Sequence, residues 1–144
     1  MKLSTRGRYG VRLLIDLAEH ASESKVSLAS VAERQAISMR YLEQIAVLLK
    51  RAGYIRSIKG SSGGYALALD ASKILIGDVL RVLEGDLNVV DELRPGESET
   101  SLQRCLRTAV YDKLNCSIAQ VVDTLTLDQM AGTTDPDSAY MYYI

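Results

Sequence analysis

The sequence has few of the residues on which disulfide scaffolds and membrane anchors depend. Its 144 residues include two cysteines, and no apolar run approaches the roughly 20 residues that a helix needs to cross a bilayer. The first ten residues, MKLSTRGRYG, also lack the apolar stretch of a signal peptide. We therefore predict a cytoplasmic protein without membrane contact. Its two cysteines have no paired spacing and suit a reducing compartment.

Catalytic motifs are also missing. His20 is the only histidine, so the sequence offers no nucleophile–base pair built on imidazole. The glycine-rich stretch KGSSGG leads into YALAL, which reads as a strand, whereas a phosphate loop leads into a helix. No cluster of residues has metal-ligand spacing. We predict neither an enzyme nor a bound cofactor or metal.

Composition instead favours one globular domain with an appended element. Hydrophobic residues make up 47% of the chain and charged residues 24%, which is ordinary for a folded protein. The charges are unevenly placed: residues 1–85 hold 13 basic and 8 acidic residues, a net of +5, whereas residues 86–144 hold 4 and 10, a net of −6. The first part is therefore the one suited to a polyanion.

Apolar periodicity predicts three helices in the basic part. Ser27 is a suitable N-cap for a second, short helix ending near Gln35, and Ser38 for a third helix that ends near Gly53. Short helix, tight turn and longer helix is the order of a helix-turn-helix motif, whose second helix enters the major groove. The first helix should bury one stripe, with Asp16 and its other charged residues outside it: Gly10, Leu13, Leu14, Leu17, Ala18 and Ala21. In the third helix the inward residues should be Leu42, Ile45, Ala46 and Leu49.

A β-hairpin is predicted directly after the third helix. YIRSI and YALAL have strand composition, and Tyr65, Leu67 and Leu69 alternate with alanines, as in a half-buried strand. The hairpin tip KGSSGG would form the wing of a winged helix-turn-helix, from which Arg56 and Lys59 can reach phosphates or a minor groove. The predicted fold class is mainly α: a winged helix-turn-helix DNA-binding domain with a β-hairpin wing and a long C-terminal dimerisation helix.

The second half of the chain predicts that long helix. A short amphipathic helix at 74–84 precedes an exposed loop that contains Pro95 and Gly96, and an apolar stripe then continues at steps of four or three residues to Leu125. We expect this helix to pair with its copy in a two-fold dimer, the alternative being that it packs back on its own domain. The expected division is 1–75 for DNA binding, 76–97 as a connector, 98–126 for dimerisation and 127–144 as a tail. The dimerisation residues are Leu102, Leu106, Val110, Leu114, Ile118 and Val121.

Five segments together resemble the Rrf2 family of winged-helix transcriptional regulators: MKLSTRGRYG, SLASVAERQAISMRYLEQI, SIKGSSGGYALAL, IGDVLRVLEG and AYMYYI. The resemblance covers nearly the whole chain. It implies a homodimer that binds a two-fold symmetric operator on double-stranded DNA, usually as a repressor. Lys59 stands where the family commonly has arginine, and Arg6 and Arg8 are either backbone contacts or solvated surface. The implied DNA-binding residues are Arg6, Arg8, Ser38, Arg40, Tyr41, Glu43, Gln44 and Lys59.

The resemblance also bears on iron. Cluster-binding members of the family have three cysteines in the loop before the long helix, but here only Cys105 occupies such a position, and Glu99 and Leu93 stand six and twelve residues earlier. We therefore do not expect the ordinary iron–sulfur cluster. The alternative function is an iron–sulfur or redox sensor using Cys105 and Cys116, which lie on one face of a regular helix about 16 Å apart.

The ending DPDSAYMYYI resembles the tail of the family's cysteine-metabolism repressor. This resemblance implies a complex with O-acetylserine thiol-lyase (cysteine synthase), with Tyr142, Tyr143 and Ile144 at the contact. The alternative is a strand packed against the dimer. We therefore expect a repressor of sulfur and cysteine metabolism genes that responds through a partner enzyme.

Overall fold

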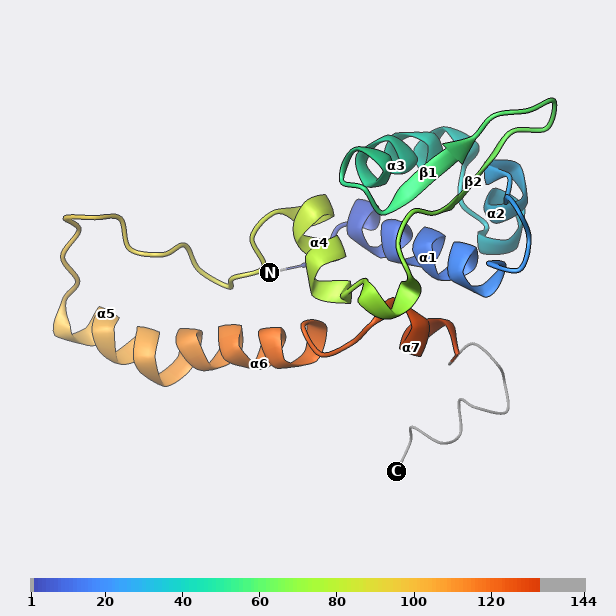
Figure 1. The fold of residues 1–144 in the computed structure, drawn as a ribbon. Coiled ribbons are helices and arrows are strands. Elements are labelled where there is room, and N and C mark those ends of the chain that lie inside the picture. Colours follow the sequence, from blue (N-terminus) through green and yellow to red (C-terminus); the bar gives the residue numbers. More distant parts are fainter. Residues whose placement is uncertain (1, 133–144) are drawn as a thin grey trace.

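The computed structural model describes residues 2–132, most of which are helical (Figure 1). The predicted mainly α fold with a two-stranded antiparallel hairpin is confirmed. In chain order the elements are α1 (Thr5–Glu19), α2 (Leu28–Gln35), α3 (Met39–Arg51), β1 (Ile55–Ile58), β2 (Gly64–Leu67), the 3₁₀ turn η1 (Ala71–Lys73), α4 (Ile76–Glu84), α5 (Ser101–Leu106), the π-helical turn η2 (Arg107–Tyr111), α6 (Asp112–Val122) and α7 (Leu127–Ala131).

Serine caps start the first three helices. The hydroxyl of Ser27 accepts the backbone N–H of Ser30, and that of Ser38 accepts the backbone N–H of Tyr41. Each bond satisfies a donor that has no partner inside its helix. Both predicted caps are therefore confirmed, as is burial of the inward face of α3, where all four predicted residues are at most 1% exposed.

Helix α1 lies at the centre of the domain. It contacts α2, α3, α4, α7 and β2, and Leu13 and Leu14 are completely buried. Gly10 lets α4 come close, because a Cβ at this position would lie 2.2 Å from a methyl carbon of Leu83. The chain returns to this core after its long helix: Leu127, the first residue of the segment expected as the tail, is fully buried, and its N–H donates to the carbonyl of Ile74 at 2.8 Å.

The expectation that Asp16 lies outside the buried stripe is wrong. Its carboxylate is 1% exposed and accepts two hydrogen bonds from Arg34, at 2.6 and 3.0 Å, and one from Gln35 at 2.9 Å. Burial disfavours the charged carboxylate, but the hydrogen bonds from Arg34 and Gln35 outweigh it and lower the pKa of Asp16. The helix face of Asp16 is buried because α2 supplies partners for its charge.

Two further details of the expected stripe and strands differ. Ala21 lies beyond the end of α1 and is exposed, since the helix ends at Glu19. Leu69 lies beyond β2 and is 46% exposed, while all four residues of β2 are half-buried, so the expected alternation is absent. The reason is that β2 is a middle strand at Tyr65, where it pairs with β1 on one side and with Val26 on the other.

The hairpin register is fixed by close backbone contacts. β1 and β2 pair from Ile55 with Leu67 to Ile58 with Gly64, and Tyr65 exchanges two backbone hydrogen bonds with Val26. A Cβ on Gly64 would lie 2.8 Å from the carbonyl oxygen of Val26, so this position requires glycine. β1 contacts α3 and β2 contacts α1, and the tip between the strands projects from the domain (Figure 1).

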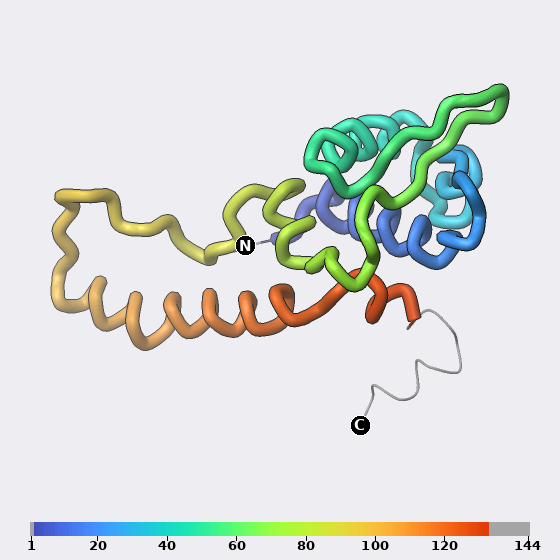
Figure 2. Tube along the Cα trace, in the orientation of Figure 1, coloured from blue at the N-terminus to red at the C-terminus, as the bar shows by residue number. Residues whose placement is uncertain are grey.

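The predicted long helix is confirmed in kind but is shorter and less regular than expected. It runs from Ser101 to Val122 as α5, η2 and α6, and it begins with a capping box formed by Thr100 and Gln103. Leu125 lies after the helix and packs against the core, where its carbonyl accepts the N–H of Ile76 at 2.9 Å. Figure 2 shows the segment between α4 and α5 leaving the domain and turning back into this helix.

Asp16→Ala should lower the free energy of unfolding by about 2 kcal/mol, because Arg34 and Gln35 lose their acceptor while Arg34 can still reach water. The pKa of Asp16 is lower in the folded chain than its ordinary value of 3.8, so its contribution is complete above that pH and is lost as the pH falls through the folded value. The destabilisation should therefore shrink in acid. Urea denaturation of both proteins at neutral pH and in acid measures this, with the exposed Glu33→Ala as control.

Candidate nucleic-acid interface

The first turns of α3 present a polar surface. Arg40, Glu43 and Gln44 are exposed there, and Ser38 is exposed at the cap position with its hydroxyl oxygen bonded to the helix. Tyr41 is half-buried, and its ring meets that of Tyr9 edge-on, with 5.7 Å between the centroids. Tyr41 therefore also holds α3 against α1.

Arg6 lies beside this surface. Its Nε donates to the carbonyl of Leu83 at 2.7 Å, and the side chain borders a hollow of about 440 Å³ together with Tyr41 and Gln44. Ser4 anchors the same end of α1, because its N–H and its hydroxyl both donate to Glu84, at 2.9 and 2.6 Å. The structure thus brings Arg6 next to α3 from a position more than thirty residues away in the chain.

Arg8 and Lys59 are both exposed. Arg8 donates to the hydroxyl of Thr5 at 3.3 Å on the same helix, and Lys59 is in the tip of the hairpin. No ion pair within residues 2–132 involves either of them, or Arg6 or Arg40. These cations are thus available to an external anion.

A contact that the sequence did not predict joins the hairpin to α3. The ammonium of Lys50, at the end of α3, donates to the hydroxyl of Ser57 in β1 at 2.9 Å. The sequence did not predict this bond because the direction of the Ser57 side chain depends on the register of the hairpin, in which Ser57 lies opposite Tyr65. Both residues are exposed, so the bond helps to orient the hairpin rather than to stabilise a core.

The long helix carries an uncovered apolar face. Leu102 and Val121 are 69% and 59% exposed, Leu106, Val110 and Leu114 are also exposed, and only Ile118 of the predicted set packs against the core. The loop before the helix covers a different side: Val89 donates to the side-chain oxygen of Asn115 at 2.8 Å, and Glu99 pairs with Arg107 at 2.7 Å.

The π-helical turn accounts for the spacing of this apolar face. In an α-helix four residues overshoot a full turn by about 40°, so a series of four-residue steps drifts around the helix. A π-helical turn holds more than four residues, so a step of four across it falls short of a full turn. The turn at Arg107–Tyr111 thus compensates the drift where Leu106, Val110 and Leu114 follow one another. It also moves Cys105 and Cys116 off a common face.

The residues near Cys105 do not fit an iron–sulfur cluster. Cys105 and Cys116 are exposed on the helix, and no group of three or more His, Cys, Asp or Glu side chains within residues 2–132 is placed to hold a metal ion. Glu99 is already bound: hydrogen bonds from Arg107 and Arg104 lower its pKa to about 2. Glu99 and Leu93, which stand at the positions of the other two cysteines, therefore offer a carboxylate that two arginines already bind and an apolar side chain in place of thiolates.

Comparison with known proteins identifies the fold's relatives. Residues 3–133 match the family model described as "Rrf2: Iron-dependent Transcriptional regulator". The chain belongs to the Rrf2 family. It is 40% identical to the transcriptional regulator CymR of Bacillus subtilis over the full length of both chains, and 52% identical to protein rrf2 of Nitratidesulfovibrio vulgaris, covering 88% of this chain and 85% of the relative.

Solved structures of Rrf2 proteins agree with this assignment. The structure titled as CymR, the global cysteine regulator of B. subtilis, matches with a TM-score of 0.81 at 38% identity, covering 94% of this chain and 99% of that one. The IscR structure from T. potens matches with a TM-score of 0.76 at 39% identity, covering 99% and 97%. This Rrf2 chain is thus a DNA-binding transcriptional regulator, like these relatives, and not an enzyme.

Within residues 2–132, no helix is long and apolar enough to span a bilayer.

The predicted contact with the enzyme cannot be compared with the fold, because Tyr142, Tyr143 and Ile144 lie outside the described residues.

Proposed function

We propose that this Rrf2 protein is a homodimer that binds a two-fold symmetric operator and represses genes of sulfur and cysteine metabolism. The observation that carries the proposed DNA-binding surface is a group of basic residues that form no ion pair within residues 2–132. Arg40 lies on α3, Arg6 lies beside α3, and Lys59 lies on the hairpin, whose strand β1 contacts α3. Such a surface suits a groove for α3 and phosphates on either side. Ser38, Tyr41, Glu43 and Gln44 complete the proposed reading surface, and Arg8 is a proposed backbone contact.

Dimerisation is proposed through the long helix. Its uncovered face is apolar at Leu102, Leu106, Val110 and Leu114 and again at Val121, and a monomer would leave that face in water. A two-fold axis places the same stripe of a second copy against it, which buries both. The proposed division of labour then gives residues 1–75 to DNA and 98–126 to pairing, with 76–97 connecting them.

The double variant Arg40→Ala, Lys59→Ala should bind operator DNA about tenfold to a hundredfold more weakly at 0.1 M salt. If each side chain neutralises one phosphate, the dimer loses four such contacts, so the slope of log K against log salt should also fall by about 4. Fluorescence anisotropy with a symmetric promoter fragment measures both quantities. Lys113→Ala, an exposed charge on α6, is the control and should bind like wild type. An unchanged slope in the double variant would remove both residues from the DNA surface.

The double variant Leu106→Asp, Val110→Asp should be monomeric at micromolar concentration, because pairing would bury four carboxylates at the two-fold axis. Sedimentation velocity measures the mass, and circular dichroism checks that the domain remains folded. Gln120→Asp adds a charge to the same helix away from the stripe and should leave the dimer intact. A dimer that survives the double variant contradicts the proposed interface.

The proposed signal comes through a partner enzyme. Two findings favour an enzyme partner over an iron–sulfur cluster as the source of the signal. The chain is similar to CymR over the full length of both chains, and the residues around Cys105 fit a cluster poorly. The proposed partner is O-acetylserine thiol-lyase, contacted by Tyr142, Tyr143 and Ile144. A terminal carboxylate beside an apolar side chain has the chemistry of an amino-acid ligand.

Deleting Tyr143 and Ile144 should abolish binding of the enzyme, because the deletion removes that apolar residue and moves the carboxylate. Titration calorimetry with purified O-acetylserine thiol-lyase measures the affinity. Adding the substrate O-acetylserine should compete with the intact chain. Equal affinity of the intact and shortened chains would mean that the tail does not carry the contact.

A further inference from the structure

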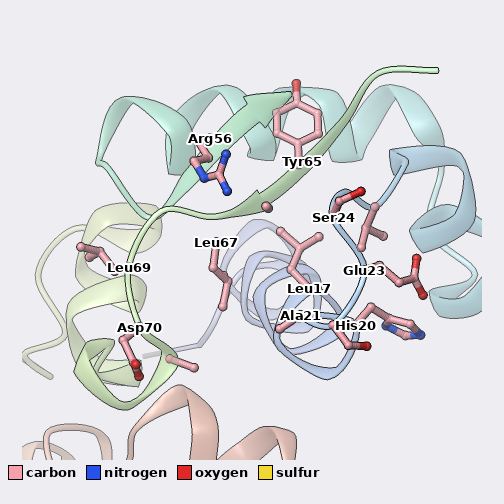
Figure 3. A pocket seen from close by; sticks show the side chains of 14 residues that line it. Leu17, His20, Ala21, Glu23, Ser24, Arg56, Tyr65, Leu67, Leu69 and Asp70 are labelled. Carbon is pink, nitrogen blue, oxygen red and sulfur yellow. The ribbon is translucent and has the colours of Figure 1, made fainter. Parts of the chain in front are cut away.

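A second concave site lies on the other side of the hairpin from α3. An open cavity of about 560 Å³ is lined by the end of α1, the loop after it, β2 and the start of η1. Figure 3 shows it with Leu17 and Leu67 at its apolar base. Because β1 contacts α3 and β2 contacts α1, this cavity lies on the α1 side of the hairpin.

Opposite charges line this cavity without pairing. Arg56 reaches it from β1, since its register partner in β2 is Ala66, whose side chain is too small to block it. Glu23 lies on the loop at the opposite side (Figure 3). Neither residue takes part in an ion pair within residues 2–132. The carboxylate of Asp70, by contrast, is already used, because it accepts the N–H and the hydroxyl of Ser72.

The backbone of β2 adds a donor and an acceptor that have no partner within residues 2–132. Ala68 donates to Tyr54 across the hairpin, and Tyr65 bonds to Val26 on the other side, so alternate residues of β2 point to opposite edges. Leu67 therefore directs its N–H and C=O away from β1, toward the cavity that it lines. Continuing the pairing of Val26 with Tyr65 would set Ser24 opposite Leu67, but no backbone bond joins these two residues. The cavity is the gap left where the two segments diverge.

We propose that this cavity binds a zwitterionic ligand of the size of a dipeptide. Its ammonium group pairs with Glu23, its carboxylate pairs with Arg56, its amide bonds to the backbone of Leu67, and an apolar side chain packs on the half-buried side chain of Leu67. A peptide-like ligand satisfies all four features at once, whereas a simple anion or cation leaves one wall charge unpaired. A site of this kind goes beyond the proposed function, and it is tested on the protein alone.

The test uses three matched probes with the full chain: L-alanyl-L-leucine, its N-acetyl derivative without the ammonium, and its C-terminal amide without the carboxylate. Calorimetry should show saturable binding of the free dipeptide, and each blocked form should bind about tenfold more weakly, because each loses one charge-assisted contact. In ¹⁵N-labelled protein the amide resonance of Leu67 should shift on addition of the free dipeptide.

Two variants assign the ends of the ligand. Arg56→Gln should lower the affinity for the free dipeptide about tenfold and leave the affinity for the C-terminal amide unchanged. Glu23→Gln should also lower the affinity for the free dipeptide about tenfold, but it should leave the affinity for the N-acetyl form unchanged. Arg51→Gln and Glu92→Gln remove exposed charges outside the cavity and serve as controls. Absence of saturable binding, or equal affinity for the three probes, would overturn the proposal. Neither result bears on DNA binding, since no DNA is present.

Discussion

Burial of α1 is the constraint on which the rest of the structure depends. Packing against it positions α3, α4, α7 and the hairpin. Each fully buried leucine of α1 contributes about 2 kcal/mol from removal of apolar surface from water. That force is not directional, and it does not by itself set the angle at which α2 crosses α1.

The pair of Asp16 and Arg34 supplies the missing direction. A guanidinium bonded through two nitrogens to both carboxylate oxygens accepts little rotation, so it fixes α2 against α1. The turn after α2 is short, and Ala36 ends that helix in the left-handed conformation, so the angle of α2 also determines where α3 begins. A buried charge far from the proposed DNA surface thereby determines how that surface is presented.

Local signals predicted the elements, whereas pairings between elements had to be observed. Ser27 and Ser38 could be recognised as caps because capping depends on a residue and its next three neighbours. Burial of Asp16 depends on an arginine 18 residues away on another helix, so residue type alone pointed to the wrong side. The proposed base-reading positions of α3 follow from their place in the helix, but the direction of Arg56 follows from strand register. The sequence did contain a signal for the π-helical turn. Apolar residues that repeat every four positions would drift around a regular α-helix, so a long run of such steps indicates an irregular turn.

Charge does not oppose the proposed pairing, although residues 86–144 are acidic as a whole. The segment proposed to pair, 98–126, holds three acidic and three basic residues, so two copies of it carry no like net charge that would repel. Its acidic residues also have partners within the chain: Glu99 and Asp112 both pair with Arg107, and Asp123 pairs with Arg81 of α4. These ion pairs lie beside the apolar stripe and not on it. They are weak as sources of stability, because most of their partners are exposed to water, although the side chain of Glu99 is only 10% exposed. Each pair sets a positive charge against a carboxylate, so the segment can present an apolar face to its own copy, while Arg6, Arg40 and Lys59, which form no ion pair within residues 2–132, remain in the first part of the chain for the proposed contact with DNA.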